Sequence, residues 1–180
     1  TLDGVTLSTS SGSPIDIQAG ASADIILKNE NTLTGANGSP AIHVPKDAVV
    51  TIQGTGVLNA YGGQYAAAVG GAVQEENGTI TITGGTFNLY GNSNAAVGAG
   101  SGAQTPVGSI ILTGGAVKAE NSMGESGFGA EPVNAAGEKL TRLICQLSAQ
   151  NISIDGVPCG AVTANDDGMW YLYVLPQKTT

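Results

Sequence analysis

Residues 78–91 read GTITITGGTFNLYG, and residues 108–121 read GSIILTGGAVKAEN. Each stretch holds a short strand pattern in which apolar and polar residues alternate, then a Gly-Gly pair, then a second alternating strand. Alternation places every second side chain on the same face of a strand. The two stretches start at Gly78 and Gly108 and match position by position, so the chain repeats one structural unit.

The same unit occurs twice before these stretches. Residues 23–35 read ADIILKNENTLTG, and residues 48–62 read AVVTIQGTGVLNAYG. The repeat, with a period of roughly 25–31 residues, predicts four stacks of apolar side chains. These stacks are Leu27, Ile52, Ile82 and Leu112; Ile25, Val50, Ile80 and Ile110; Leu33, Leu58, Phe87 and Val117; and Val44, Val69, Val97 and Phe128. An incomplete first turn contributes Leu7, Ile15 and Ile17.

A parallel β-solenoid explains this repeat. One turn cannot bury its apolar face alone, whereas stacked turns form a continuous core. We therefore predict an all-β protein with a right-handed parallel β-helix of about four to five turns over residues 1–138. An antiparallel β-sandwich also contains many short strands, but it does not place one residue class at the same spacing along the chain.

Residues 139–180 depart from this spacing and predict a small C-terminal antiparallel β cap. The turn sequence Asn-Asp-Asp-Gly at 165–168 lies between two strand patterns and is typical of a hairpin. A cap is expected because an open solenoid end exposes unpaired backbone and core side chains. Cys145 and Cys159 lie in this segment. They form either a disulfide, which suits a secreted protein, or two buried free thiols.

The composition restricts the classes of partner. The 180 residues include 28 glycines, only 11% are charged, and the formal net charge is −8. A chain this acidic lacks the positive surface that nucleic acids and anionic membranes attract. No apolar stretch approaches the ~18 residues of a membrane span. We expect neither nucleic-acid binding nor membrane insertion.

Residues 11–54, with the GTITITGGTFNLYG stretch and the Ala-Val-Gly runs that follow, resemble the glycine-rich parallel β-helix repeats of secreted surface proteins of anaerobic gut bacteria. They are also similar to clostridial β-helix carbohydrate-binding domains. The likeness covers about residues 1–130. It implies an extracellular β-helix, and some family members bind acidic or plant cell-wall polysaccharides with calcium. It transfers no ligand residues, because the shared motif builds the scaffold.

The second strand of each turn predicts a binding face. Its outward residues in three successive turns are Asn59 and Tyr61, Asn88 and Tyr90, and Lys118 and Glu120. Strands about 4.8 Å apart would stack the two tyrosines beside a row of amides. Sugar rings pack their CH faces on such rings and pair their hydroxyls with amides. The candidate carbohydrate-binding residues are Tyr61, Tyr90, Asn59, Asn88, Glu120 and the loop residue Tyr65. Alternatively, these ladders only stabilise the surface.

Catalysis is not predicted. Polysaccharide cleavage needs clustered carboxylates, and the adjacent acidic pairs, Glu75–Glu76 and Asp166–Asp167, fit a solvated turn and a hairpin turn. Their oxygens make them weak calcium candidates, and no other cofactor is expected. His43 is the sole histidine and is expected to be an outward surface residue rather than a base or ligand.

The sequence therefore predicts a non-catalytic extracellular surface or adhesion module that binds a polysaccharide or host glycan. The alternative is a structural stalk or fibre unit that contacts other copies or neighbouring domains of a larger surface protein. A polysaccharide lyase or hydrolase is the least favoured class. The chain opens with Thr1 rather than methionine, as expected of a processed or excised segment whose signal or anchor lies outside it.

Overall fold

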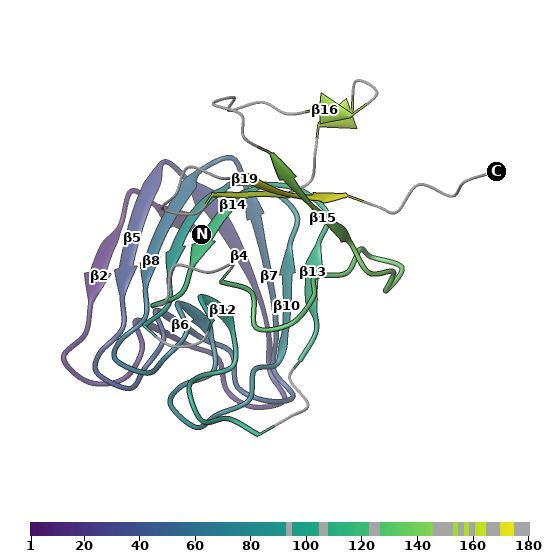
Figure 1. Ribbon diagram of the computed structural model, residues 1–180. Coiled ribbons are helices and arrows are strands. Elements are labelled where there is room, and N and C mark those ends of the chain that lie inside the picture. The colour runs from purple at the N-terminus through teal and green to yellow at the C-terminus, as the bar shows by residue number, and fades with distance from the viewer. Residues whose placement is uncertain are drawn as a thin grey trace.

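The computed structural model describes residues 1–92, 95–104, 108–122 and 127–145. It also describes four later strands, β16 (Ser153–Ile154), β17 (Val157–Pro158), β18 (Ala161–Ala164) and β19 (Trp170–Val174). All regular elements in these ranges are β-strands, and most of them wind into one solenoid (Figure 1). The predicted all-β class and the parallel solenoid are confirmed.

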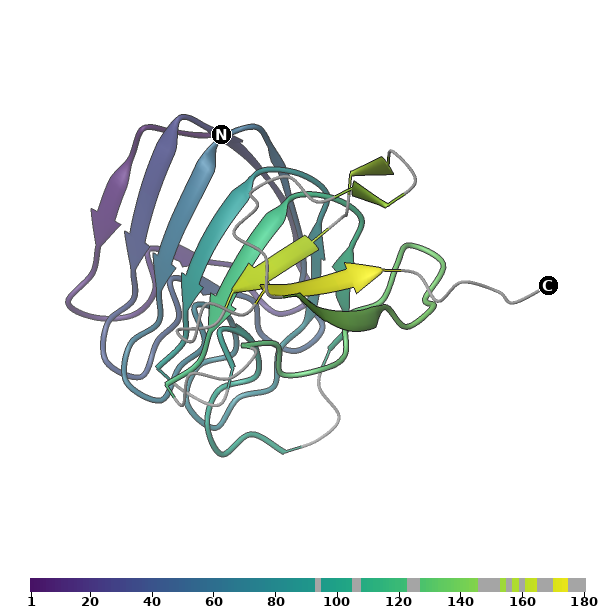
Figure 2. The same cartoon turned by 45° about the horizontal axis from the view of Figure 1, so that its top comes forward.

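Three parallel sheets form the walls of the solenoid. The isoleucine sheet contains β1 (Leu2–Asp3), β4 (Ser22–Lys28), β7 (Val49–Gly54), β10 (Thr79–Ile82) and β13 (Ile110–Leu112). The tyrosine sheet contains β2 (Thr6–Ser8), β5 (Glu30–Thr34), β8 (Val57–Tyr61), β11 (Thr86–Tyr90) and β14 (Ala116–Glu120). The short sheet contains β3 (Ile15–Asp16), β6 (Ile42–His43), β9 (Val69–Gly70) and β12 (Val97–Gly98). Figure 2 shows the tyrosine sheet as a row of parallel arrows.

The length of the repeat agrees with the predicted range. Leu2 pairs with Leu27 and Val97 pairs with Phe128, and these two offsets match the shorter and the longer end of that range. The predicted stacks also hold from the β7–β8 turn onward. Their members pair as Val50 with Ile80 and Ile110, Ile52 with Ile82 and Leu112, Leu58 with Phe87 and Val117, and Val69 with Val97.

The predicted register is wrong by two residues between two successive turns, the one that contains β4 and β5 and the one that contains β7 and β8. Ile25 lies opposite Ile52 rather than Val50, and Leu33 lies opposite Ala60 rather than Leu58. The partner of Leu27 is accordingly Gly54. In the short sheet it is Ile42, and not Val44, that pairs with Val69. A shift of one residue would expose the core, but a shift of two keeps every side chain on its face, so alternation cannot detect it.

Asn31 occupies the core position that this shift opens in front of Leu58. It is fully buried, and its amide is satisfied by backbone groups of three consecutive turns. The Val5 N–H donates to Asn31 Oδ1 at 3.1 Å, and Asn31 Nδ2 donates to the carbonyls of Lys28 at 2.9 Å and Val57 at 3.2 Å. Asn31 therefore closes the corner between β4 and β5, where apolar side chains could not pair these groups.

The solenoid turns sharply after the short sheet, at one left-handed residue in each of four turns. The φ angles of Gly20, Asp47, Gln74 and Gly102 are 77°, 66°, 63° and 80°. Glycine adopts this conformation without strain, whereas Asp47 and Gln74 bear a steric penalty of about 1 kcal/mol each. Gly70 in β9 is needed for another reason, because a Cβ there would lie 1.9 Å from the carbonyl oxygen of Gly98.

The interior is a single apolar column. Leu, Ile, Val and Ala side chains from all three sheets are buried in it, and Phe87 is the largest. At the C-terminal end, the bridges from Val97 to Phe128 and from Ile111 to Val133 continue the parallel stacking beyond the last named strands.

The predicted antiparallel cap corresponds to a three-stranded sheet in the order β15 (Thr141–Cys145), β19 and β18. Strand β18 lies beside β14 of the tyrosine sheet (Figure 2). The solenoid pattern thus ends in antiparallel pairing close to the predicted boundary, and the division into two domains stays a prediction.

Candidate functional site

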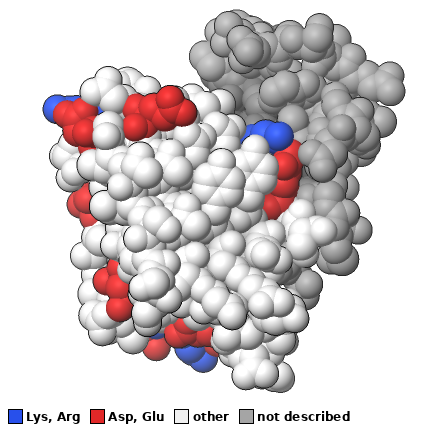
Figure 3. All heavy atoms as spheres, turned by 90° about the vertical axis from the view of Figure 1, so that its left-hand side faces the viewer, with Lys and Arg blue, Asp and Glu red and all other residues white. Residues whose placement is uncertain are grey.

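The outward face of the tyrosine sheet carries the predicted aromatic stack. Tyr61 ends β8, Tyr90 ends β11, and the two residues lie opposite each other in the register. Their rings are stacked, with centroids 5.1 Å apart and planes 6° from parallel. Tyr61 is 40% exposed, and Tyr90 is partly buried. Figure 3 shows this side of the molecule, where charged atoms lie near the margins and the broad middle carries none.

A row of hydrogen-bonded amides runs parallel to the tyrosine stack, two residues earlier on each strand. Asn88 Nδ2 donates to Asn59 Oδ1 at 2.8 Å, and Asn59 Nδ2 donates to Glu30 Oε1 at 2.9 Å. Each primary amide has two donor hydrogens and two acceptor lone pairs. The row between Asn59 and Asn88 therefore keeps further hydrogen-bonding capacity toward the solvent.

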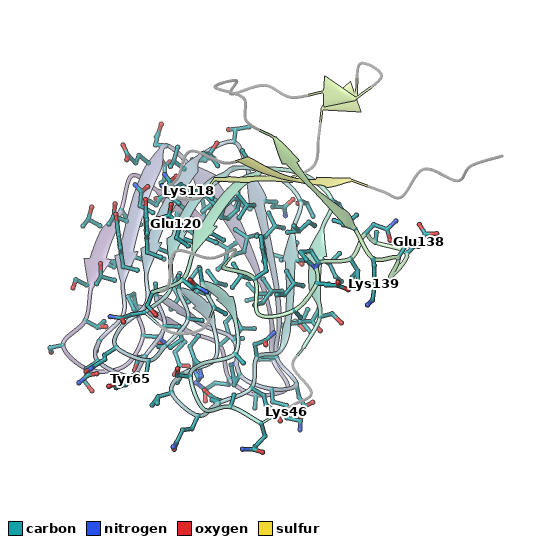
Figure 4. All side chains as sticks on the ribbon, viewed as in Figure 1. Lys46, Tyr65, Lys118, Glu120, Glu138 and Lys139 are labelled. Atoms are coloured by element: carbon teal, nitrogen blue, oxygen red, sulfur yellow. The ribbon has the colours of Figure 1, made fainter. Side chains whose placement is uncertain are left out.

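An ion pair closes the C-terminal end of the stack. Lys118 Nζ lies 2.6 Å from Glu120 Oε1 and 5.5 Å from the centroid of the Tyr90 ring. The hydrogen bond to Glu120 raises the pKa of the Lys118 ammonium above its ordinary value, although partial burial opposes this effect. Figure 4 shows the two side chains next to each other on the last strand of the sheet. Glu120 lies opposite Tyr90 in the register but is only 8% exposed, so it is less accessible than expected, and its role as a binding residue stays a prediction.

Tyr65 lies apart from this face. It follows β8 in the loop toward the short sheet, it is 52% exposed, and Figure 4 places it among the lower loops, away from Lys118 and Glu120. Its φ is 66°, at a corner where Gly38 takes the equivalent place one turn earlier with a φ of 77°. A tyrosine in this conformation is strained. The structure thus brings together Tyr61, Tyr90, Asn59 and Asn88, and it leaves Tyr65 at a separate corner.

A cluster of ionisable side chains on the short sheet is absent from the sequence-based expectations. His43 in β6 lies between two carboxylates, with Nδ1 2.6 Å from Asp16 Oδ1 and Nε2 2.6 Å from Glu75 Oε2. Partial burial lowers the pKa of His43, but the hydrogen bonds to Asp16 and Glu75 raise it by more, so the net pKa lies above its ordinary value of 6.5. We name Asp16, His43 and Glu75 the histidine clasp. The expectation of a plain surface histidine is therefore incomplete, since the side chain is 20% exposed and joins three segments.

Part of the clasp was readable from the sequence. Ile15 and Ile42 occupy equivalent places in successive turns and pair in the short sheet, so their neighbours Asp16 and His43 must be adjacent as well. Glu75 gives no such signal, because it reaches the histidine from the loop after β9. Its Oε2 also accepts a hydrogen bond from the N–H of Ala72 at 3.1 Å, which holds the carboxylate in place.

The two acidic residues proposed as a solvated calcium pair point to different partners. Glu75 belongs to the histidine clasp, and Glu76 Oε2 lies 3.0 Å from Lys46 Nζ. In the described part of the chain, no group of three or more His, Cys, Asp or Glu side chains is arranged to hold a metal ion. The other candidates, Asp166 and Asp167, lie outside the described residues, and so does Cys159 of the predicted disulfide, whereas Cys145 is described only as a backbone position in β15.

Within the described ranges, no helix is long and apolar enough to cross a membrane. No protein-family model, curated protein or solved structure matches the chain.

Proposed function

We propose that the chain is a non-catalytic extracellular surface module that binds a polysaccharide or host glycan through the outward face of the tyrosine sheet. The observation that carries the proposal is the exposed stack of Tyr61 on Tyr90 next to the Asn59–Asn88 amide row. An aromatic surface beside spare amide donors and acceptors offers the two contacts that a sugar ring needs. The rings and the amides already hold one another in place, so little ordering of side chains is required on binding.

Binding to immobilised glycans tests the proposal. The wild-type chain should bind at least one neutral or acidic polysaccharide, and Tyr61→Ala should weaken that binding by about tenfold or more. Thr81→Ala is the matched control, because Thr81 is a partly exposed residue of β10 on the isoleucine sheet. Failure to bind any glycan, with the solenoid folded as judged by circular dichroism, would contradict the proposal.

The same geometry also favours a structural stalk as the second candidate. The outward residues satisfy one another from turn to turn, since the tyrosine rings stack together and each asparagine donates to the preceding turn. Such ladders stabilise a surface without a ligand. A stalk predicts that Tyr61→Ala lowers the stability of the solenoid and affects no glycan, whereas the binding module predicts the loss of glycan binding.

A further inference from the structure

The two faces of the tyrosine stack are not equivalent. Tyr90 has Tyr61 against one face of its ring, and Lys118 Nζ lies over the ring at 5.5 Å on the side of β14. Tyr61 has Tyr90 on one side, and on the other side its partner in the register is Thr34 of β5. Because threonine is much smaller than tyrosine, no described register partner covers the Tyr61 face on the side of Thr34, which leaves room there for a planar or chair-shaped ring.

The position above Thr34 is the place that a third stacked ring would occupy. Strands in the sheet are about 4.8 Å apart, and the next residue in this row, Ser8 of β2, is also small and exposed. The CH face of a pyranose can lie against an aromatic face much as another aromatic ring does. A sugar placed there would extend the stack by one turn toward the N-terminus.

Polar groups lie beside the position above Thr34, in the neighbouring row of outward residues. Asn59 uses one amide hydrogen for Glu30 and one lone pair for Asn88, which leaves one of each for a ligand. Glu30 is exposed, and Thr32 contributes a partly exposed hydroxyl between Glu30 and Thr34 on β5. The hydroxyls of a sugar could pair with these groups while its ring covers Tyr61.

The charges near the position disfavour an anionic ligand. Glu30 supplies a carboxylate, and the one cation among the described residues of the tyrosine-sheet strands, Lys118, is held by Glu120 beyond Tyr90. A uronic acid or sulfated sugar on Tyr61 would face Glu30, and the described strands of the tyrosine sheet offer it no unpaired cation. The formal net charge of −8 opposes the approach of a polyanion as well.

From these observations we infer that the ligand is a neutral pyranose, one ring of which stacks on the free face of Tyr61 above Thr34. This inference rests on the proposed carbohydrate-binding function and names the ligand class and the position of the ring. Of the acidic or plant cell-wall polysaccharides that some members of the resembling family bind, it excludes the acidic ones.

Thr34→Tyr tests the position of the ring. The new ring should fill the place of the sugar and continue the stack, so the protein should remain folded while binding of neutral glycans falls by about tenfold or more. Tyr61→Ala should cause a similar loss, and Tyr61→Phe, which keeps the ring, should retain binding. The readouts are titration against soluble neutral glucan, mannan and galactan, with circular dichroism and the midpoint of thermal unfolding as controls for folding.

The outcomes separate the inference from the function on which it rests. Unchanged binding in folded Thr34→Tyr, with binding lost in Tyr61→Ala, would overturn the position of the ring but leave the function intact. Preference for polygalacturonate or a sulfated glycan over its neutral counterpart would overturn the ligand class alone. A wild-type chain that binds none of these glycans would overturn both.

Discussion

The outward faces of the tyrosine sheet and the short sheet carry different side chains at the same spacing between turns. Tyr61 stacks on Tyr90 and Asn59 bonds to Asn88, so like neutral residues follow one another. On the short sheet, the partner of Asp16 is His43, so unlike residues follow one another. Strands about 4.8 Å apart make every outward residue a close neighbour of its equivalents.

This contrast indicates which rows of outward residues a solenoid can tolerate. Like charges opposite each other repel, whereas like aromatic rings or amides attract. A row of identical residues must therefore be neutral, and a charged row must alternate in sign. This condition accounts for the low share of charged residues, 11%, in a chain with this many turns.

The largest expected effect concerns a close approach in the short sheet. In Gly70→Ala, the new Cβ would lie 1.9 Å from the carbonyl oxygen of Gly98, at a φ of 138°. The backbone must move, so we expect a loss of about 3 kcal/mol or more in the free energy of unfolding. Gly20→Ala is the matched control, because its φ is 77° but nothing lies within 4 Å of the new Cβ. It should lose only about 1 kcal/mol. Urea unfolding measures both, and equal losses would contradict the role of close packing.

The next largest effect is the difference in stability loss between replacing a buried and an outward asparagine of the tyrosine sheet. Asn31→Leu should lower the free energy of unfolding by about 2 kcal/mol, although it adds an apolar residue in front of Leu58, because it leaves the partly buried Val5 N–H without its partner. Asn59→Leu, on the outward face, should change the same quantity by about 0.5 kcal/mol. If Asn31→Leu were neutral or stabilising, the buried hydrogen bonds would not maintain this corner.

The histidine clasp should make stability depend on pH. The pKa of His43 in the folded chain lies above its ordinary value of 6.5, which represents the unfolded chain. The folded state therefore holds the proton more tightly, so the clasp contributes fully below about pH 6.5 and is lost as the pH rises through the folded pKa. We expect the free energy of unfolding to fall by only about 1 kcal/mol as the pH rises, because Asp16 is half exposed to solvent. Thermal unfolding between about pH 6 and pH 9 measures it, and His43→Gln should remove this loss. An unchanged slope in His43→Gln would contradict the assignment.

The smallest effect concerns the coupling within the tyrosine stack. A double-mutant cycle of Tyr61→Ala and Tyr90→Ala should give a coupling of about 0.5 to 1 kcal/mol, since stacked rings contribute this much beyond their buried area. Pairing Tyr61→Ala with Thr81→Ala on the isoleucine sheet should give no coupling, because those residues share no contact. A coupling close to zero for the two tyrosines would mean that the stack is kept for binding rather than for stability.

The sequence predicted the stack of Tyr61 on Tyr90 because both residues end an equivalent strand in successive turns. It did not predict the buried Asn31 or the reach of Glu75 to His43. A polar residue in an alternating strand does not itself indicate whether it faces the core or the solvent. Its face is inferred from its neighbours, and that inference fails where the register is wrong, as it is at Asn31. A loop of irregular length, such as the one after β9, carries no periodicity from which a contact can be read.

The alternating pattern and its repeat determined the all-β class, the parallel stacking, the length of the turns and the inward or outward direction of most side chains. The tertiary structure decided the pairing of Ile25 with Ile52, the histidine clasp and the pairing of Tyr61 with Thr34. The reason is that a strand has a period of two residues, so its pattern specifies a face but not a partner. Partners depend on the corners, where backbone conformation and local hydrogen bonds such as those of Asn31 set the register.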